Sequence, residues 1–442
     1  MVLPQRETVL IRGAYVMTLE AELGDVAGGD VLIRDGAIAA VGRGLEAPGA
    51  AVIEAGGMIA LPGFVDTHWH MWNTLLRCMS GDRPEHGYFK TSVGLGQVFE
   101  AEDVYQGTRL ACAEAIHSGI TTVHDWSHNV RGPECALAGL RALQESGLRG
   151  RFSYGYRQAH PNEEAMDLEH LEQLAGEWER HAPGGLLRLG MAWRGTAGSN
   201  PTIRVPAKVY LAEIKAARRL GLPISVHASG PPWAAGQIRA LAEAGLLGPD
   251  MQVVHGNAAT EDEIRALAEA GAAVSVSPFT ELHIGYGMPR TSEFLAAGIP
   301  TGLSVDTTVL AGNADMSGIM KVTQAVENGK AQNEFHLTAR RTLELATVDS
   351  ARSLGLGEVV GTLRPGKRAD VILISPHGPN LGVFAEPAHM VVSAAQPANI
   401  DTVVVDGRVL KRHGRLTRRD ADAVGWEADR ALARVRERAG WW

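Results

Sequence analysis

Cysteine is scarce in this chain, whose 442 residues include only Cys78, Cys112 and Cys135. The number is odd and no Cys-x-x-Cys pair occurs, which argues against a disulfide framework and against a cysteine-based zinc site. We therefore expect a protein of the reducing cytoplasm.

Long apolar runs and a surplus of basic residues are also lacking. No stretch of about eighteen apolar residues occurs, and the N-terminal segment lacks an apolar signal core, so we expect neither a membrane span nor a signal peptide. Acidic residues outnumber basic ones by 50 to 42, and the net charge of -8 gives no electrostatic footprint for nucleic acid. The 45% of hydrophobic residues is enough for a large globular core.

Strand and helix signals divide the chain into three parts. Residues 1–60 and 357–416 carry short alternating apolar segments with glycines between them, which predicts strands that pair into one composite β-sandwich domain. Residues 61–356 repeat a helical segment, a glycine and a short apolar run about eight times, which predicts a (β/α)8 TIM barrel. An open doubly wound sheet is the alternative, but no Gly-x-Gly-x-x-Gly turn follows the first strand. Residues 417–442 are expected to form a C-terminal helix.

Polar residues follow several of the predicted barrel strands. His68 and His70 are two positions apart at the end of one strand, so their imidazoles point to the same side. His227, His255 and Asp306 each follow another apolar run. Because the chemistry of such a barrel lies at the C-terminal ends of its strands, we expect these side chains to converge. Histidine nitrogens, one carboxylate and a water molecule would complete a mononuclear metal site.

These segments resemble the amidohydrolase superfamily, and within it the branch of TRZ/ATZ hydrolases and nucleobase deaminases. The similarity extends over about residues 8–416 and rests on the segments LPGFVDTHWH, GLPISVHAS, VVHGN, GLSVD and GTLRPGKRADVILI. It implies a TIM barrel with a composite β domain, and one divalent metal ion per chain. Zinc is expected, with iron and manganese as alternatives. The metal ligands that the resemblance implies are His68, His70, His227 and Asp306.

The resemblance also implies roles in catalysis. His255 would polarise the substrate or position the attacking water, and Asp306 would accept the proton of that water. The chain departs from the family where relatives read His-x-x-Glu, because it reads HASG and Gly230 cannot transfer a proton. Glu281, which follows the seventh strand, is the first candidate for the missing acid. No lysine ends the fourth strand, so a binuclear site with a carboxylated lysine is not expected.

Five further residues are candidates for substrate binding. Arg194 stands where relatives commonly carry a substrate-contacting histidine, and its guanidinium suits a carboxylate or carbonyl group. A salt bridge to a nearby carboxylate is the alternative for Arg194. His128 is a candidate for lining the pocket. Trp69, Trp72 and Tyr286 are candidates for an aromatic wall around a flat ring, with burial in the core as the alternative.

The sequence thus predicts a metal-dependent hydrolase that cleaves a non-peptide carbon–nitrogen bond in a small cyclic or heteroaromatic substrate through activated water. One alternative is the displacement of chloride or thiolate from a triazine-like ring or a thiocarbamate, for which a weaker proton donor suffices. Another is a catalytically silent binding protein. We expect a small-molecule substrate, no nucleic-acid or membrane partner, and a homo-oligomer.

Overall fold

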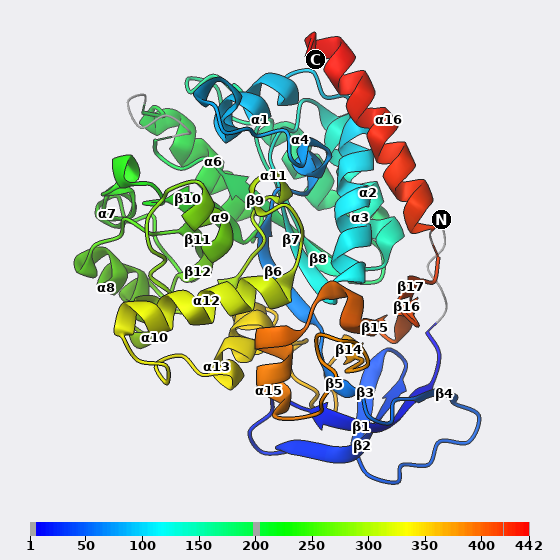
Figure 1. Ribbon diagram of the computed structural model, residues 1–442. Helices are drawn as coiled ribbons and strands as arrows, with labels where there is room; N and C mark the ends of the chain where they lie inside the picture. Colours follow the sequence, from blue (N-terminus) through cyan, green and yellow to red (C-terminus); the bar gives the residue numbers. More distant parts are fainter. Residues whose placement is uncertain (1–5, 198–203, 419, 442) are drawn as a thin grey trace.

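The computed structural model describes residues 6–197, 204–418 and 420–441. Two sheets organise these residues: eight parallel strands that curve into a barrel, and nine strands drawn from both ends of the chain. In Figure 1 the blue N-terminal strands and the orange C-terminal strands lie together below the barrel. The predicted TIM barrel and the predicted composite β domain are both confirmed.

The barrel strands alternate with helices along the chain. Nearly all strand residues are buried, because helices cover the outer face and side chains fill the interior, and the strands therefore read as short apolar runs. The strands are β6 (Phe64–Trp69), β7 (Ile120–Ser127), β8 (Arg149–Tyr154), β9 (Leu187–Trp193), β10 (Ile224–Ala228), β11 (Met251–His255), β12 (Ala273–Val276) and β13 (Thr301–Leu303).

The helices differ widely in length, and several end at a left-handed glycine. Helix α8 (Glu261–Ala270), for example, begins with a capping box between Thr260 and Glu263 and ends at Gly271, whose φ is 68°. The helices around the barrel are α1 (Tyr88–Gly96), α2 (Ala101–His117), α3 (Pro133–Ser146), α4 (Leu168–Gly176), α5 (Trp178–His181), α6 (Ala207–Arg219), α7 (Gln237–Glu243), α8 (Glu261–Ala270), α9 (Pro278–His283), α10 (Thr291–Ala296), α11 (Thr308–Ala311), α12 (Met316–Ala331), α13 (Ala339–Glu344) and α14 (Ser350–Ser353).

The barrel closes between its first and last strands, β6 and β13. The backbone N–H of His70 donates to the carbonyl of Asp306 at 2.7 Å, and the N–H of Asp306 donates to the carbonyl of His68 at 2.9 Å. The buried carboxylate of Asp66 accepts hydrogen bonds from the N–H groups of Val305 at 2.7 Å and His68 at 3.1 Å. The segments that close the barrel are therefore the ones that carry three of the expected metal ligands.

The nine-stranded sheet joins the two ends of the chain. Its strands β5 and β14 pair antiparallel, with Leu61 opposite Ile372. At the start of β8, Arg149 donates to the carboxylate of Asp370 at 2.8 and 3.1 Å, which ties the barrel to this sheet. The strands are β1 (Val9–Met17), β2 (Asp25–Arg34), β3 (Ala37–Gly42), β4 (Ala51–Glu54), β5 (Ile59–Pro62), β14 (Val371–Ile374), β15 (Ile400–Val405), β16 (Arg408–Arg412) and β17 (Arg415–Leu416).

The C-terminal segment forms helix α16 (Ala421–Ala439), which lies alongside α2 on the outside of the barrel (Figure 1). Ion pairs join the two helices, from Arg109 to Glu427 and from Arg438 to Asp103. A short helix, α15 (Pro387–His389), follows β14. Within the described ranges, no helix combines the length and the apolar character needed to cross a membrane.

Candidate active site

Four side chains, from the C-terminal ends of β6 and β10 and from the loop after β13, converge on one point. The ligand atoms of His68, His70, His227 and Asp306 all lie within 4.8 Å of one another. The Nε2 atoms of His68 and His70 are 3.3 Å apart, and they lie 3.3 and 3.4 Å from Oδ1 of Asp306. Such a donor set, three imidazoles and a carboxylate, is one that zinc and related divalent metals accept. The predicted ligand residues are therefore together and fit a metal ion.

Burial sets the charge state of these ligands. Burial, reinforced by neighbouring imidazoles, lowers the pKa of His68, His70 and His227 well below the usual value. All three rings are therefore neutral at pH 7 and keep a lone pair for a metal. Burial raises the pKa of Asp306 to about 6, against the opposing influence of His255 and His128.

Two residues at the site hold strained backbone conformations. His255 and Asp306 have φ values of 78° and 62°, in the left-handed region that side chains other than glycine rarely adopt. Each such residue costs about 1–3 kcal/mol, which the surrounding hydrogen bonds must offset. The strain lies where strands β11 and β13 give way to loops, and it aims both side chains into the barrel mouth.

Glu281 contacts the site through His255. Its carboxylate oxygen Oε1 lies 3.1 Å from Nδ1 of His255 and accepts a hydrogen bond from the N–H of Ser277 at 2.8 Å. Asn257 donates to the other carboxylate oxygen at 3.2 Å. Although burial opposes protonation, the Glu281 hydrogen bond and the charge of Asp306 raise the pKa of His255. Glu281 is fully buried and does not line the cavity at this end of the barrel, so it reaches that cavity only by way of His255.

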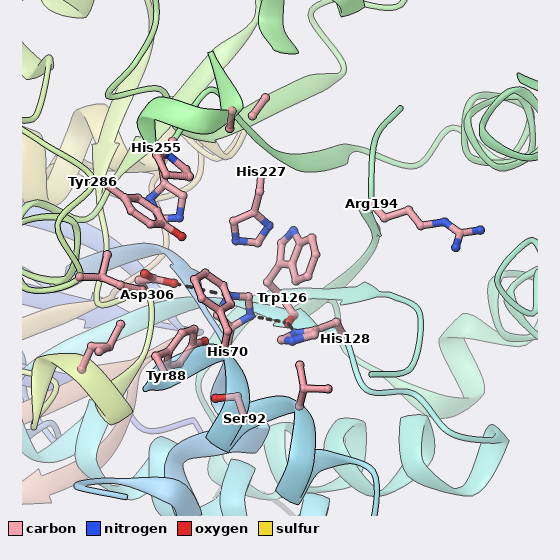
Figure 2. A pocket seen from close by; sticks show the side chains of 18 of the residues that line it. His70, Tyr88, Ser92, Trp126, His128, Arg194, His227, His255, Tyr286 and Asp306 are labelled. Atoms are coloured by element: carbon pink, nitrogen blue, oxygen red, sulfur yellow. Dashed lines mark hydrogen bonds and ion pairs between the residues drawn. The ribbon is translucent and has the colours of Figure 1, made fainter. Parts of the chain in front are cut away.

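Tyr286 fills the space beside Gly230. A Cβ atom at Gly230 would lie 3.2 Å from Cε2 of Tyr286 and 3.3 Å from Cβ of His255. Figure 2 shows the Tyr286 ring beside His255 with its hydroxyl turned into the cavity near Asp306. Burial, followed by the charge of Asp306, raises the pKa of Tyr286, so the hydroxyl stays protonated. A proton donor therefore faces the cavity where the expected glutamate is missing.

The guanidinium of Arg194 is directed away from the metal ligands. It forms a buried ion pair with Glu213 at 3.0 Å and donates to the carbonyls of Pro161, at 2.9 Å, and Glu164. Figure 2 shows the side chain pointing out of the ligand cluster, although Arg194 lines part of the cavity wall. The salt bridge considered as its alternative role is the one present, with a partner on helix α6.

The expected aromatic wall needs a correction at Trp69 and Trp72. Both side chains are buried in apolar clusters and neither lines the cavity. Trp69 stands between His68 and His70 on β6, and strand alternation turns it to the opposite side. The indole N–H of Trp72 donates to Nδ1 of His128 at 3.3 Å, so it supports a cavity-lining histidine from behind.

Other aromatic residues supply the wall. Trp126 was not among the predicted residues, yet its ring centroid lies 4.4 Å from that of His227. The alternation of His124, Trp126 and His128 along one strand was the signal that could have found it. Of these, His124 is bonded to the carbonyl of Thr67 and to Ser153, both at 2.8 Å, and lies outside the cavity. The aromatic residues that line the cavity are Tyr88, Phe89, Trp126, Tyr156, Trp193, Trp233 and Tyr286.

Two named enzymes are similar in sequence to this chain over nearly its whole length. The chain is 29% identical to a 5'-deoxyadenosine deaminase of Methanosarcina mazei, over 96% of this chain and 97% of that one. It is 28% identical to a 5-methylthioadenosine/S-adenosylhomocysteine deaminase of Desulforamulus reducens, over 97% of this chain and 99% of that one.

Solved structures match the whole fold. An adenosine deaminase from Xanthomonas campestris with bound zinc superposes with a TM-score of 0.85 at 22% identity, covering 98% of this chain and 100% of that one. An atrazine chlorohydrolase from Arthrobacter aurescens, complexed with zinc, superposes with a TM-score of 0.83 at 22% identity, covering 96% of this chain and 100% of that one. The model of the amidohydrolase family matches residues 59–410. The chain therefore belongs to the amidohydrolase family, as its histidine and aspartate motifs predicted.

Proposed function

We propose that this protein is an aminohydrolase that releases ammonia from a ring carbon of a small aminated heterocycle. The observation that carries the proposal is the convergence of the four ligand residues with His255 and Tyr286 around one cavity with aromatic walls. The names of its deaminase relatives favour an adenine ring bearing a modified sugar as the substrate. A flat ring suits walls such as Trp126, because aromatic faces stack on one another.

The metal part of the proposal is one zinc ion per chain. His68, His70, His227 and Asp306 would hold it, and the zinc in two related structures supports this choice over iron and manganese. When bound, such a cation lowers the pKa of a water molecule from 15.7 to about 7 and so supplies hydroxide at neutral pH.

Three residues of the chain supply the proton transfers and the charge stabilisation of the proposed reaction. Asp306 accepts the proton of the attacking water. His255, hydrogen-bonded to Glu281, donates a hydrogen bond to the ring atom on which negative charge develops. The hydroxyl of Tyr286 donates a proton to the departing amine, in the place of the glutamate that relatives carry near Gly230.

A direct test combines metal analysis with product analysis. We expect about one divalent metal per purified chain and chelator-sensitive release of ammonia from aminated purine nucleosides. Release of chloride or thiolate from substituted rings without any ammonia would favour the displacement reaction instead. Protein without metal and without turnover on either panel would leave a silent binding protein and overturn the proposal.

Glu281→Gln tests whether the His255 pair matters. We expect kcat to fall by about 10- to 100-fold with unchanged metal content, since residues that orient a catalytic group typically have effects of this size. The hydrogen bond and the charge of Glu281 raise the pKa of His255. Removal of the Glu281 charge should therefore lower that pKa and move the alkaline limb of the kcat–pH profile to lower pH. Glu269→Gln on the exposed face of α8 is the matched control. An unaltered rate and pH profile for Glu281→Gln would remove the pair from the mechanism.

We further propose that the protein works on small molecules in the cytoplasm as a homo-oligomer. The three cysteines are free, and Cys112 and Cys135 are buried, which suits a reducing compartment. The tendency of the family toward oligomers supports the second point, and sedimentation of the purified chain measures it.

A further inference from the structure

A second cavity, of about 560 Å³, opens at the end of the barrel opposite the metal ligands. Its wall is formed by the N-terminal ends of the strands and the loops that lead into them. In TIM barrels this end serves stability, while chemistry is confined to the other end. The polar residues in the wall do not fit a purely structural role. They are Arg151, Arg188, Arg218, Arg352, Asp250, Gln252 and Ser353.

Two of these arginines lack a counter-ion. Arg218 is paired with Asp250 at 2.8 Å, and Arg352 with Asp349 at 3.2 Å. Arg151 is only 6% exposed and donates to a carbonyl, that of Leu354 at 2.7 Å. Within the described part of the chain, no carboxylate forms an ion pair with Arg151 or Arg188. A buried cation without an anion is costly, and burial together with Arg188 lowers the pKa of Arg151 to about 10.

The two arginines also face each other. Arg151 on β8 pairs directly with Arg188 on β9, so their side chains leave the sheet on the same face. Like charges directly opposite one another destabilise a sheet unless an anion lies between them. Both residues line the cavity, and Arg188 is exposed to solvent, so an anion has a path to reach them.

A further hydrogen-bond donor lines the same cavity. Gln252 is 2% exposed, and its side-chain oxygen accepts from the hydroxyl of Ser225 at 3.2 Å. The same side chain lies against His124, and its amide nitrogen has no acceptor in good hydrogen-bond geometry among the described residues. A buried donor without a well-placed acceptor is costly, and a ligand oxygen would remove that cost. The wall thus offers two guanidinium groups that donate to carbonyls, of Leu354 and Gly355, but have no counter-ion among the described residues, together with one buried amide N–H donor.

We propose that this cavity is a binding site for a phosphate group, held between Arg151 and Arg188. The planar guanidinium fork matches two oxygens of a tetrahedral oxyanion, which favours such an anion over chloride. The cavity has room for an inorganic phosphate ion or for the phosphate of a small phosphomonoester. The site is separate from the proposed aminohydrolase centre and does not depend on it.

The test measures binding of phosphate by the intact, metal-loaded protein. Isothermal titration with inorganic phosphate, at ionic strength held constant with sodium chloride, should give a saturable site, and phosphate should raise the Tm where chloride does not. Arg188→Gln, at an exposed position that should fold normally, is expected to weaken phosphate binding at least about 10-fold, the loss of one charge-assisted contact. Arg265→Gln, which removes an exposed arginine on α8 outside the cavity, should bind phosphate like the parent.

Parallel titrations separate the possible ligands and the possible failures. Tighter binding of glycerol 3-phosphate than of inorganic phosphate, lost in Arg188→Gln, would identify a phosphomonoester site. The reverse order would identify a site for the free ion. No saturable phosphate binding, or equal affinity in Arg188→Gln and Arg265→Gln, would overturn the proposal. Arg151→Gln is a second test variant. The folded variant should not show the phosphate-dependent rise in Tm.

Discussion

Asp306→Asn is expected to lower the rate of ammonia release by about 10⁴-fold or more, the size of effect seen when a central catalytic group is removed. Asparagine preserves the size of the side chain and one of its oxygens. It loses the negative charge that holds a divalent cation beside His68 and His70, and it cannot accept a proton from water. Metal content per chain and single-turnover rates measure the two losses separately.

The control for Asp306→Asn is Asp262→Asn, at an exposed position on α8 where the carboxylate pairs with Arg265. This control should keep both the metal and the rate. If Asp306→Asn retained a full complement of metal and its activity, the proposed centre would be wrong, because no other carboxylate belongs to the ligand group among the described residues.

Tyr286→Phe is expected to lower kcat for ammonia release by about 10²- to 10⁴-fold, the range for general acid catalysis. The substitution removes one oxygen and keeps the ring that fills the space beside Gly230, so the metal content and the Tm should not change. The rate of ammonia release at saturating substrate measures the effect.

The dependence on the leaving group makes the Tyr286→Phe test specific. A chloro-substituted ring needs no protonation of its leaving group, so its hydrolysis should be much less affected than that of the amino-substituted ring. Tyr210→Phe on α6, which lies outside the cavity, is the matched control. An equal loss of rate on both rings would show that the hydroxyl binds substrate and is not the proton donor.

The metal ligands were predictable because their positions follow from local pattern. His68, His70, His227 and Asp306 each end an apolar run, and in a parallel barrel all such ends meet at one mouth. Their spacing of two at the end of β6 turns the imidazoles of His68 and His70 to the same side, where their Nε2 atoms lie 3.3 Å apart.

Side-chain partners from distant elements were not predictable. Arg194 is neutralised by Glu213, which is 19 residues away on a helix, and the sequence alone could not show that the helix turns this carboxylate inward. Glu281 was expected as a direct acid, but the first turn of α9 places it behind His255. Tyr286 was expected only as part of an aromatic wall. Its proposed role as proton donor rests on the structure, in which its ring lies beside Gly230.

A cation bound at the proposed site would also stabilise the closure of the barrel between β6 and β13. Asp66 and Val305, which are hydrogen-bonded across this closure, are 239 residues apart in the chain. A cation held by His68, His70 and Asp306 would act as a reversible cross-link over a very long loop, and its binding energy would add to the stability of the folded state by mass action. Loss of such a cation would therefore lower the free energy of unfolding of the enzyme.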